Sequence, residues 1–345
     1  MGTIAELGIG IGDTPVETVM LHCRGIIRPV LLKCESHNPT GSVKDRTALG
    51  LVTAMHQARP LTPGSVVVES TSGNLGLALA RLLRGLDCQL IVIVDPKTPQ
   101  HTQAALARAG AQVRCVTEPD DYGGYLMTRL RTVERMCRAN PDYRWSDQYH
   151  STANPAVHRR TTGPEILAAG GPELDAVYAA VSTGGTLAGI AAHLRPLRPE
   201  VRVVAVDALS SRASGPAVTG RRLLPGIGSS RRSVFLRPHS FDYAVRVADA
   251  DAIAMCRILL ADTGISIGGS SGAVLYACLR DLERPDPARH PLCLCADGGA
   301  AYADTIHDDA WLAGADLLDE VRHAVRRHRV AGVHFTSMAP HPTPM

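Results

Sequence analysis

One lysine, in a segment that predicts a tight turn, has the setting that covalent chemistry needs. The segment reads Asn38-Pro39-Thr40-Gly41-Ser42-Val43-Lys44-Asp45-Arg46. Pro39 and Gly41 favour a turn, and Lys44 follows where a helix is expected to begin. A helix N-terminus disfavours a cation, so this position would lower the pKa of the lysine amine. A neutral amine is what Schiff-base chemistry requires, although an exposed helix-start lysine is the alternative.

Three loops rich in glycine, serine and threonine open into predicted helices and could bind anions. They are Ser70-Thr71-Ser72-Gly73-Asn74, Ser182-Thr183-Gly184-Gly185-Thr186 and Gly268-Gly269-Ser270-Ser271-Gly272. The second loop offers backbone N–H groups and hydroxyls that suit a phosphate monoester, but it lacks the lysine of a Walker motif. Around Thr71, hydroxyls and amides could hold a carboxylate, and Asn74 could donate to a ring hydroxyl. The alternative for the first two loops is a capped helix-start turn.

Short apolar runs must position these loops. Runs rich in β-branched residues are expected to form strands at 29–34, 65–69, 89–94, 112–116, 176–181, 201–206 and 292–296. Amphipathic helical patterns follow several of them, at 75–84, 102–109, 187–194 and 250–262. Continuous apolar strands with crossover helices predict an α/β fold with parallel sheets covered on both faces. In such folds ligands bind where loops leave the carboxyl ends of strands, which is where the three loops lie.

The composition predicts a globular protein of more than one domain. The chain has 345 residues, of which 45% are hydrophobic and 20% charged, with a formal net charge of +3. Arginines are scattered, so we expect no nucleic-acid partner. The nine cysteines lack zinc spacing, and Cys293 and Cys295 lie in an expected buried strand, which favours core thiols over a metal site. We see neither a signal-peptide pattern nor a membrane-spanning run, and expect a cytoplasmic protein without membrane contact.

Taken together, the motifs resemble those of a known enzyme family. NPTGSVKDR, STSGN, STGGT and GGSSGA, in this order and at these separations, are similar to motifs of the fold-type II pyridoxal-phosphate (PLP) enzymes of the cysteine synthase/cystathionine β-synthase family. The resemblance extends from about residue 12 to about residue 311. It implies two open twisted α/β domains of the tryptophan synthase β-like class, with PLP in the interdomain cleft. It also implies a homodimer.

The resemblance and the strand pattern together give an expected domain organisation. Residues 1–44 and 150–330 would form the larger, PLP-binding domain. Residues 45–149 would form a smaller mobile domain inserted into it. Residues 331–345 would form a disordered tail, because the last ten residues contain three prolines and no apolar periodicity.

The resemblance also implies a role for each matching residue. Lys44 would bind PLP covalently and carry the substrate α-proton, while Asn74 would bond the ring hydroxyl and Ser270 would face the pyridine nitrogen. A neutral serine there makes the ring a weaker electron sink than an aspartate would, which favours prompt loss of a β-substituent. The phosphate of PLP would be held by Ser182, Thr183, Gly184, Gly185 and Thr186. The substrate α-carboxylate would be held by Thr71, Ser72, Gly73 and Gln148.

Further stretches resemble one group within the family, the N-(2-amino-2-carboxyethyl)-L-glutamate synthases. These stretches are residues 121–129, 145–149, 224–231 and 309–312. Enzymes of that group join O-phospho-L-serine to the amino group of L-glutamate through an α-aminoacrylate and release phosphate. The product leads to 2,3-diaminopropionate, a building block of siderophores and peptide antibiotics. Because glutamate brings two carboxylates, Arg129 would bind it, with Tyr149 and Ser182 on the same side; a solvated helix arginine is the alternative.

Several other functions stay open on the sequence alone. The STGGT loop and residues 161–166 are similar to cysteine synthases, which use sulfide with O-acetylserine or O-phosphoserine. Another amine nucleophile in the same β-replacement is a second possibility. A catalytically idle PLP-fold regulator is a third, although the presence of Lys44, Asn74 and Ser270 argues against it. Arg231 and Arg232 could meet a phosphate leaving group or form a surface pair.

Overall fold

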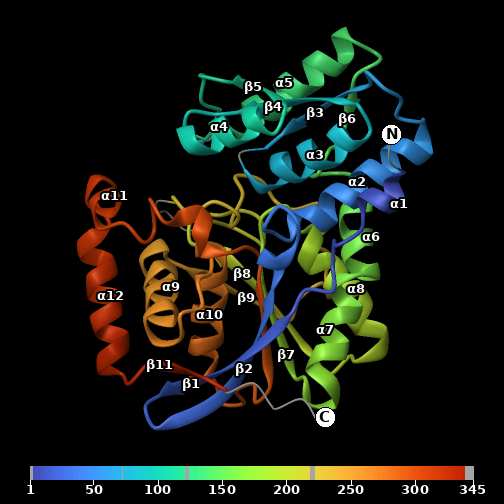
Figure 1. Ribbon diagram of the computed structural model, residues 1–345. Coiled ribbons are helices and arrows are strands. Elements are labelled where there is room, and N and C mark those ends of the chain that lie inside the picture. Colours follow the sequence, from blue (N-terminus) through green and yellow to red (C-terminus); the bar gives the residue numbers. More distant parts are fainter. Residues whose placement is uncertain (1–2, 72, 121–123, 218–221, 339–345) are drawn as a thin grey trace, which may run out of the picture.

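The computed structural model describes residues 3–71, 73–120, 124–217 and 222–338, and its strands form two separate sheets (Figure 1). The larger sheet has the strand order β11-β1-β2-β10-β7-β8-β9. These strands are β1 (Val16–Cys23), β2 (Ile26–Cys34), β7 (Ala176–Ala180), β8 (Arg202–Ala208), β9 (Tyr243–Val247), β10 (Pro291–Cys295) and β11 (His334–Ser337). The five strands from β2 to β9 in this order are parallel, and β1 is antiparallel to both of its neighbours.

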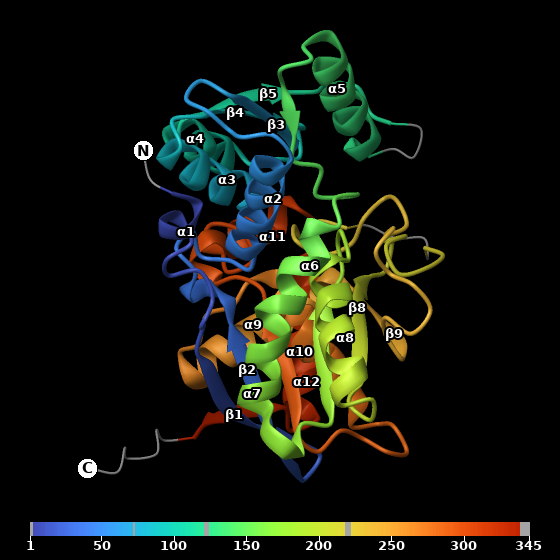
Figure 2. The same ribbon diagram turned by 90° about the vertical axis from the view of Figure 1, so that its right-hand side faces the viewer.

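The smaller sheet is parallel throughout and has the order β5-β4-β3-β6. Its strands are β3 (Val66–Ser70), β4 (Gln89–Val94), β5 (Ala111–Cys115) and β6 (Arg144–Trp145). One face is covered by α2 (Lys44–Ala58), α3 (Asn74–Gly85) and α4 (Gln100–Arg108), and the other by α5 (Leu126–Ala139). Figure 2 shows α5 on the far side of this sheet from α2 and α3.

Helices also cover both faces of the larger sheet, as continuous apolar strands require. On one face lie α9 (Asp249–Thr263), α10 (Gly269–Asp281) and α12 (Leu318–Val330), and on the other α7 (Thr162–Gly170) and α8 (Gly185–Leu197) (Figure 1). The remaining helices are α1 (Ile4–Leu7), α6 (Ala153–Arg160) and α11 (Asp309–Gly314). The predicted α/β class with parallel sheets is confirmed, and every predicted strand is present within three residues of its expected bounds. No helix in the described ranges is long and apolar enough to cross a membrane.

Both chain ends differ from the expectation. Residues 334–337, predicted to belong to a disordered tail, instead form β11, which pairs with β1. That part of the prediction is wrong because Phe335 is buried to 2% exposure in the core of the larger sheet, a contact that the proline-rich sequence around it conceals. At the other end, Leu7 packs against Gly85 of α3. This N-terminal segment, expected in the larger domain, therefore contacts a helix that covers the smaller sheet. Residues 339–345 lie outside the described residues.

Candidate active site

Lys44 is the first residue of α2, directly after the predicted turn. The Ser42 hydroxyl accepts the N–H of Lys44 at 3.2 Å, and the N–H of Val43 donates to the carbonyl of Ala296 at 2.8 Å. The second bond fixes the start of α2 against the end of β10 in the larger sheet. Burial lowers the pKa of Lys44, while the nearby Asp297 carboxylate acts in the opposite direction. The amine of Lys44 is therefore easier to deprotonate than that of an exposed lysine.

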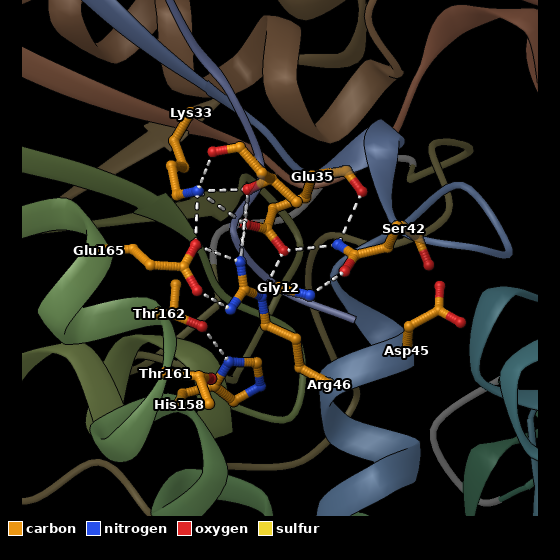
Figure 3. A network of polar contacts seen from close by, with 12 residues as sticks. Gly12, Lys33, Glu35, Ser42, Asp45, Arg46, His158, Thr161, Thr162 and Glu165 are labelled. Atoms are coloured by element: carbon orange, nitrogen blue, oxygen red, sulfur yellow. Dashed lines mark hydrogen bonds and ion pairs between the residues drawn. The ribbon is translucent and has the colours of Figure 1, made fainter. Parts of the chain in front are cut away.

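A paired ionic network holds the same turn in place (Figure 3). The guanidinium of Arg46 donates to Glu35 at 2.7 Å and to Glu165 of α7 at 2.6 Å. Lys33 of β2 adds a second cation, 2.7 Å from Glu165. Asn38, in the turn itself, donates to Glu35 at 2.9 Å. The segment that carries Lys44 is therefore tied to β2 and to α7 by buried, mutually neutralised charges.

Asp297 lies beside Lys44, although the sequence analysis did not single it out. It follows β10, is 5% exposed, and accepts two hydrogen bonds on Oδ2, from Asn74 Nδ2 at 2.8 Å and from the Tyr302 hydroxyl at 2.5 Å. Its backbone carbonyl accepts from Gly268 at 3.2 Å. Asp297 therefore joins three of the predicted motifs. An acidic residue directly after a wholly apolar strand was the signal that could have revealed it.

Ser270, the residue expected to face the pyridine nitrogen, lies in the first turn of α10 and is 2% exposed. It lies against Gly226, since a Cβ added there would be 3.6 Å from the Ser270 hydroxyl. Gly226 has a φ of +79°, a conformation that favours glycine. The start of α10 is thus packed between Asp297 and the loop around Gly226.

The loop 182–186 makes a backbone cradle at the N-terminus of α8. Gly184 has a φ of +86°, and a Cβ there would meet the Ser233 hydroxyl. A Cβ on Gly185 would meet the side-chain oxygen of Asn154. The Thr183 hydroxyl accepts from Asn154 at 3.2 Å and its carbonyl accepts from Ser233 at 2.6 Å. The first N–H groups of a helix lack acceptors inside the helix, so this rigid loop suits a phosphate.

A buried histidine, His158, contacts a hydroxyl of the same loop. His158 Nε2 lies 3.3 Å from the hydroxyl of Thr186 and 3.0 Å from that of Thr47. Burial lowers the pKa of His158 well below its usual range, and Lys44 acts in the same direction. The imidazole is therefore neutral and positions the hydroxyls without adding a charge beneath the loop.

Two of the residues expected at the substrate carboxylate meet at the end of β3. The side-chain amide of Gln148 donates to the carbonyl of Ser70 at 2.9 Å, directly before Thr71. The Thr71 hydroxyl accepts the N–H of Gly73 at 3.4 Å. Ser72, expected at the same carboxylate, lies outside the described residues. The loop between β3 and α3 thus carries Thr71 and Gly73, and Gln148, which follows β6, contacts the strand end directly before them.

Arg129 is buried in α5, with 8% of its surface exposed, so it is not a solvated helix arginine. Its Nε lies 3.2 Å from Asp95 in an ion pair. Neither Nε nor Nη1 has a hydrogen-bond partner within the described part of the chain. Burial raises the pKa of the Tyr149 hydroxyl, and the charge of Arg129 acts against that rise, so the two side chains are near neighbours.

Arg222 is a second cation here that the sequence analysis missed. Its Nη1 is buried without a partner among the described residues and lies against Gly228, where a Cβ would be 2.8 Å away. The Gly228 carbonyl accepts from the Ser182 hydroxyl at 3.2 Å. Arg231 lies nearby, with its Nη2 3.0 Å from His150 Nε2. The charges of Arg222 and Arg231 also act against the rise in the pKa of Tyr149, which is consistent with a group of cations near the STGGT loop.

These residues fit PLP. The rigid loop before α8 suits its phosphate, Asn74 and Ser270 begin two helices that meet through Asp297, and the Lys44 amine lies beside that junction. A fold with two α/β layers and such a site defines the class of fold-type II PLP-dependent enzymes.

The chain belongs to the pyridoxal-phosphate dependent enzyme family, whose model matches residues 8–295. It is 40% identical to the N-(2-amino-2-carboxyethyl)-L-glutamate synthase of Ralstonia nicotianae over 303 residues, which is 88% of this chain and 89% of that protein. It is also 40% identical to the enzyme of the same name from Cupriavidus metallidurans, over 88% of this chain and 89% of that protein. Among solved structures it is similar to O-ureido-L-serine synthase, with a TM-score of 0.78 and 29% identity over 91% of this chain and 99% of that chain.

Proposed function

We propose that this enzyme joins O-phospho-L-serine to the amino group of L-glutamate, giving N-(2-amino-2-carboxyethyl)-L-glutamate and phosphate. The observation that carries the proposal is Arg129, a buried guanidinium with two nitrogen atoms that lack protein acceptors. Arg129 has an ion pair with Asp95, but buried donors without acceptors still cost free energy unless a ligand supplies the missing acceptors. Two relatives with 40% identity over most of the chain bear the name of this activity.

The choice of glutamate follows from its charge. Sulfide is small and needs no cation or hydroxyl for binding, whereas glutamate carries two carboxylates. Arg129 would receive one carboxylate in a charge-assisted hydrogen bond, with the Tyr149 and Ser182 hydroxyls beside it. Arg222 adds a further positive charge to the same region. A site built for sulfide gains nothing from these buried cations.

The remaining residues divide between binding and proton transfer. When bound, PLP supplies the electron sink that lets the β-substituent leave. The hydroxyl of Thr71 and the amide of Gln148 would hold the α-carboxylate of O-phosphoserine, together with Ser72 and Gly73. Lys44 Nζ would remove the α-proton and return it after the new carbon–nitrogen bond has formed. The lowered pKa of Lys44 favours the amine form that accepts this proton.

The finer context of the reaction follows from the same resemblance. The enzyme acts as a homodimer in the cytoplasm, in a pathway to 2,3-diaminopropionate for a siderophore or a peptide antibiotic. Residues 45–149 form a smaller domain that closes over the substrates and excludes water from the reactive centre.

The test is a competition experiment on PLP-loaded protein. The enzyme receives O-phosphoserine and O-acetylserine together, with glutamate and sulfide competing, and mass spectrometry identifies the products. We expect a glutamate adduct that forms from O-phosphoserine. Cysteine as the main product would refute the glutamate assignment and leave the chemistry of Lys44 intact.

The proposed role of Lys44 has its own test. Lys44→Ala should lower the rate of adduct formation by at least about 10³-fold, because it removes both the covalent attachment and the proton carrier. The measurement is single-turnover product formation, with the exposed Lys97→Ala as the matched control. A Lys44→Ala protein that still turned over near the rate of the control would refute the assignment.

A further inference from the structure

Asp297 occupies a position that the proposed reaction does not use. Its Oδ2 accepts both hydrogen bonds, from Asn74 and from Tyr302, while Oδ1 is buried without a partner among the described residues. A Cβ on Gly268 would overlap Oδ1 and would lie 2.8 Å from the ring of Tyr302. The carboxylate and the tyrosine therefore fill the space that this glycine leaves open at the start of α10.

Burying a carboxylate costs free energy, so the groups that stabilise Asp297 here need to be identified. Burial raises the pKa of Asp297, while the hydrogen bonds from Tyr302 and Asn74, and then the charge of Lys44, act in the opposite direction. Burying an acid is tolerated when hydrogen bonds and a nearby cation compensate for the lost hydration. Two of these groups, Asn74 and Lys44, belong to the expected cofactor site, while Tyr302 packs against the core of the larger sheet.

The hydrogen bond to Asp297 has a geometric consequence for Asn74. A side-chain amide is planar and carries two N–H groups, so directing one of them fixes the direction of the other. Asp297 takes one N–H of Asn74, which leaves the second for the ring hydroxyl of PLP. Tyr302 donates to the same carboxylate oxygen and so restrains it further.

The contact also joins the two layers of the molecule. Asp297 follows β10 of the larger sheet, and Asn74 is the first residue of α3, which covers the smaller sheet. We propose that Asp297, restrained by Tyr302, is the positioning residue that orients Asn74 toward the cofactor ring and holds the start of α3 against the larger sheet. This inference rests on the proposed role of Asn74 but not on the identity of the substrates.

The test measures cofactor binding, which needs no substrate. Apoprotein is titrated with PLP, and both the dissociation constant and the position of the visible absorbance band are recorded. Asp297→Ala should weaken PLP binding about tenfold and shift the absorbance band, since Asn74 and Tyr302 each lose a hydrogen bond to the carboxylate. Asp297→Asn keeps an acceptor for Asn74 and should restore the affinity to within about threefold of the wild type.

A double-mutant cycle separates positioning from a general structural role. If Asp297 acts through Asn74, the double variant of Asp297→Ala and Asn74→Ala should bind PLP no more weakly than Asn74→Ala alone. Fully additive losses would overturn the proposal. Should Asp297→Ala fail to fold, Tyr302→Phe carries the test, because it removes the hydrogen bond that restrains Asp297; wild-type affinity with an unshifted band in Tyr302→Phe would overturn the proposal. If the competition experiment gives no glutamate adduct but the PLP affinities change as predicted here, only the proposed function is refuted.

Discussion

Two buried arginines of this protein differ in what surrounds them. Arg46 is fully buried, and its guanidinium donates to two carboxylates, those of Glu35 and Glu165, within a network that contains as many anions as cations (Figure 3). Arg129 is buried to a similar degree, but it faces a single acid, Asp95, and two of its nitrogen atoms lack hydrogen-bond partners among the described residues.

The difference distinguishes a buried charge that stabilises the fold from one that can bind a ligand. Burying an ion costs several kcal/mol, and an ion pair with complete hydrogen bonding recovers most of this. Arg46 recovers it within the protein, so its network stabilises the turn before α2. Arg129 recovers only part of it, and an anionic substrate would supply the rest. Buried charge that is left unpaired thus indicates function better than burial alone does.

The largest expected effect is on stability, at the paired network. Arg46→Met should lower the free energy of unfolding by about 3–5 kcal/mol, because it leaves Glu35 and Glu165 buried with too few donors. Urea denaturation measures this change. Arg138→Met, which breaks the exposed pair with Glu134 on α5, is the control and should cost under about 1 kcal/mol. Equal losses in the two variants would contradict the view that the network is structural.

The second prediction concerns pH and the same network. Burial alone would raise the pKa of Glu165, but hydrogen bonds from Arg46 and Lys33 lower it to about 2. Since the folded value lies below the ordinary 4.5, the stabilisation is complete above about pH 4.5 and is lost as the pH falls toward 2. The contribution is about 3 kcal/mol.

Glu165→Gln should therefore flatten the dependence of unfolding free energy on pH between about 4.5 and 2, as measured by urea denaturation at a series of pH values. Arg129→Gln serves as the comparison and should retain the slope of the wild type, since it leaves the Glu165 pairs intact. A Glu165→Gln profile as steep as that of the wild type would show that other acids dominate in this range.

The third and smallest expected effect is on substrate binding at Arg129, whose buried guanidinium has two nitrogen atoms without hydrogen-bond partners among the described residues. Arg129→Gln should raise the KM for glutamate by up to about 100-fold, because a charge-assisted hydrogen bond contributes about 1.5–3 kcal/mol. It should lower the free energy of unfolding by less than Arg46→Met does, because it removes one ion pair, with Asp95, where Arg46→Met removes two. Steady-state kinetics and urea denaturation measure the two quantities. Arg138→Gln, on the exposed side of the same helix, is the control, and an equal KM in both variants would remove Arg129 from the site.

The local elements and the motifs could be predicted from the amino-acid sequence. The runs that became β4 and β10 are apolar because parallel strands are buried on both faces, and such runs are legible without a structure. The turn before Lys44 and the loop before α8 are likewise set by glycine and by residues that favour helix starts, whose preferences act over a few residues. In contrast, β1 alternates in burial, β6 has two residues, and β11 lies in a proline-rich end, so their local patterns are weak.

Which side chains contact one another could not be predicted in this way, because it depends on the tertiary fold. Asn74 and Asp297 are separated by 223 residues, and Arg46 and Glu165 by 119, so no local pattern relates them. Whether Arg129 is a solvated or a buried cation depended on how α5 packs on the smaller sheet. Backbone preferences are local and therefore readable along the chain. The pairing of charges depends on how the two sheets and their helices pack together. A charge without a partner costs much free energy only after packing has excluded water from it, and only then does it indicate a binding site.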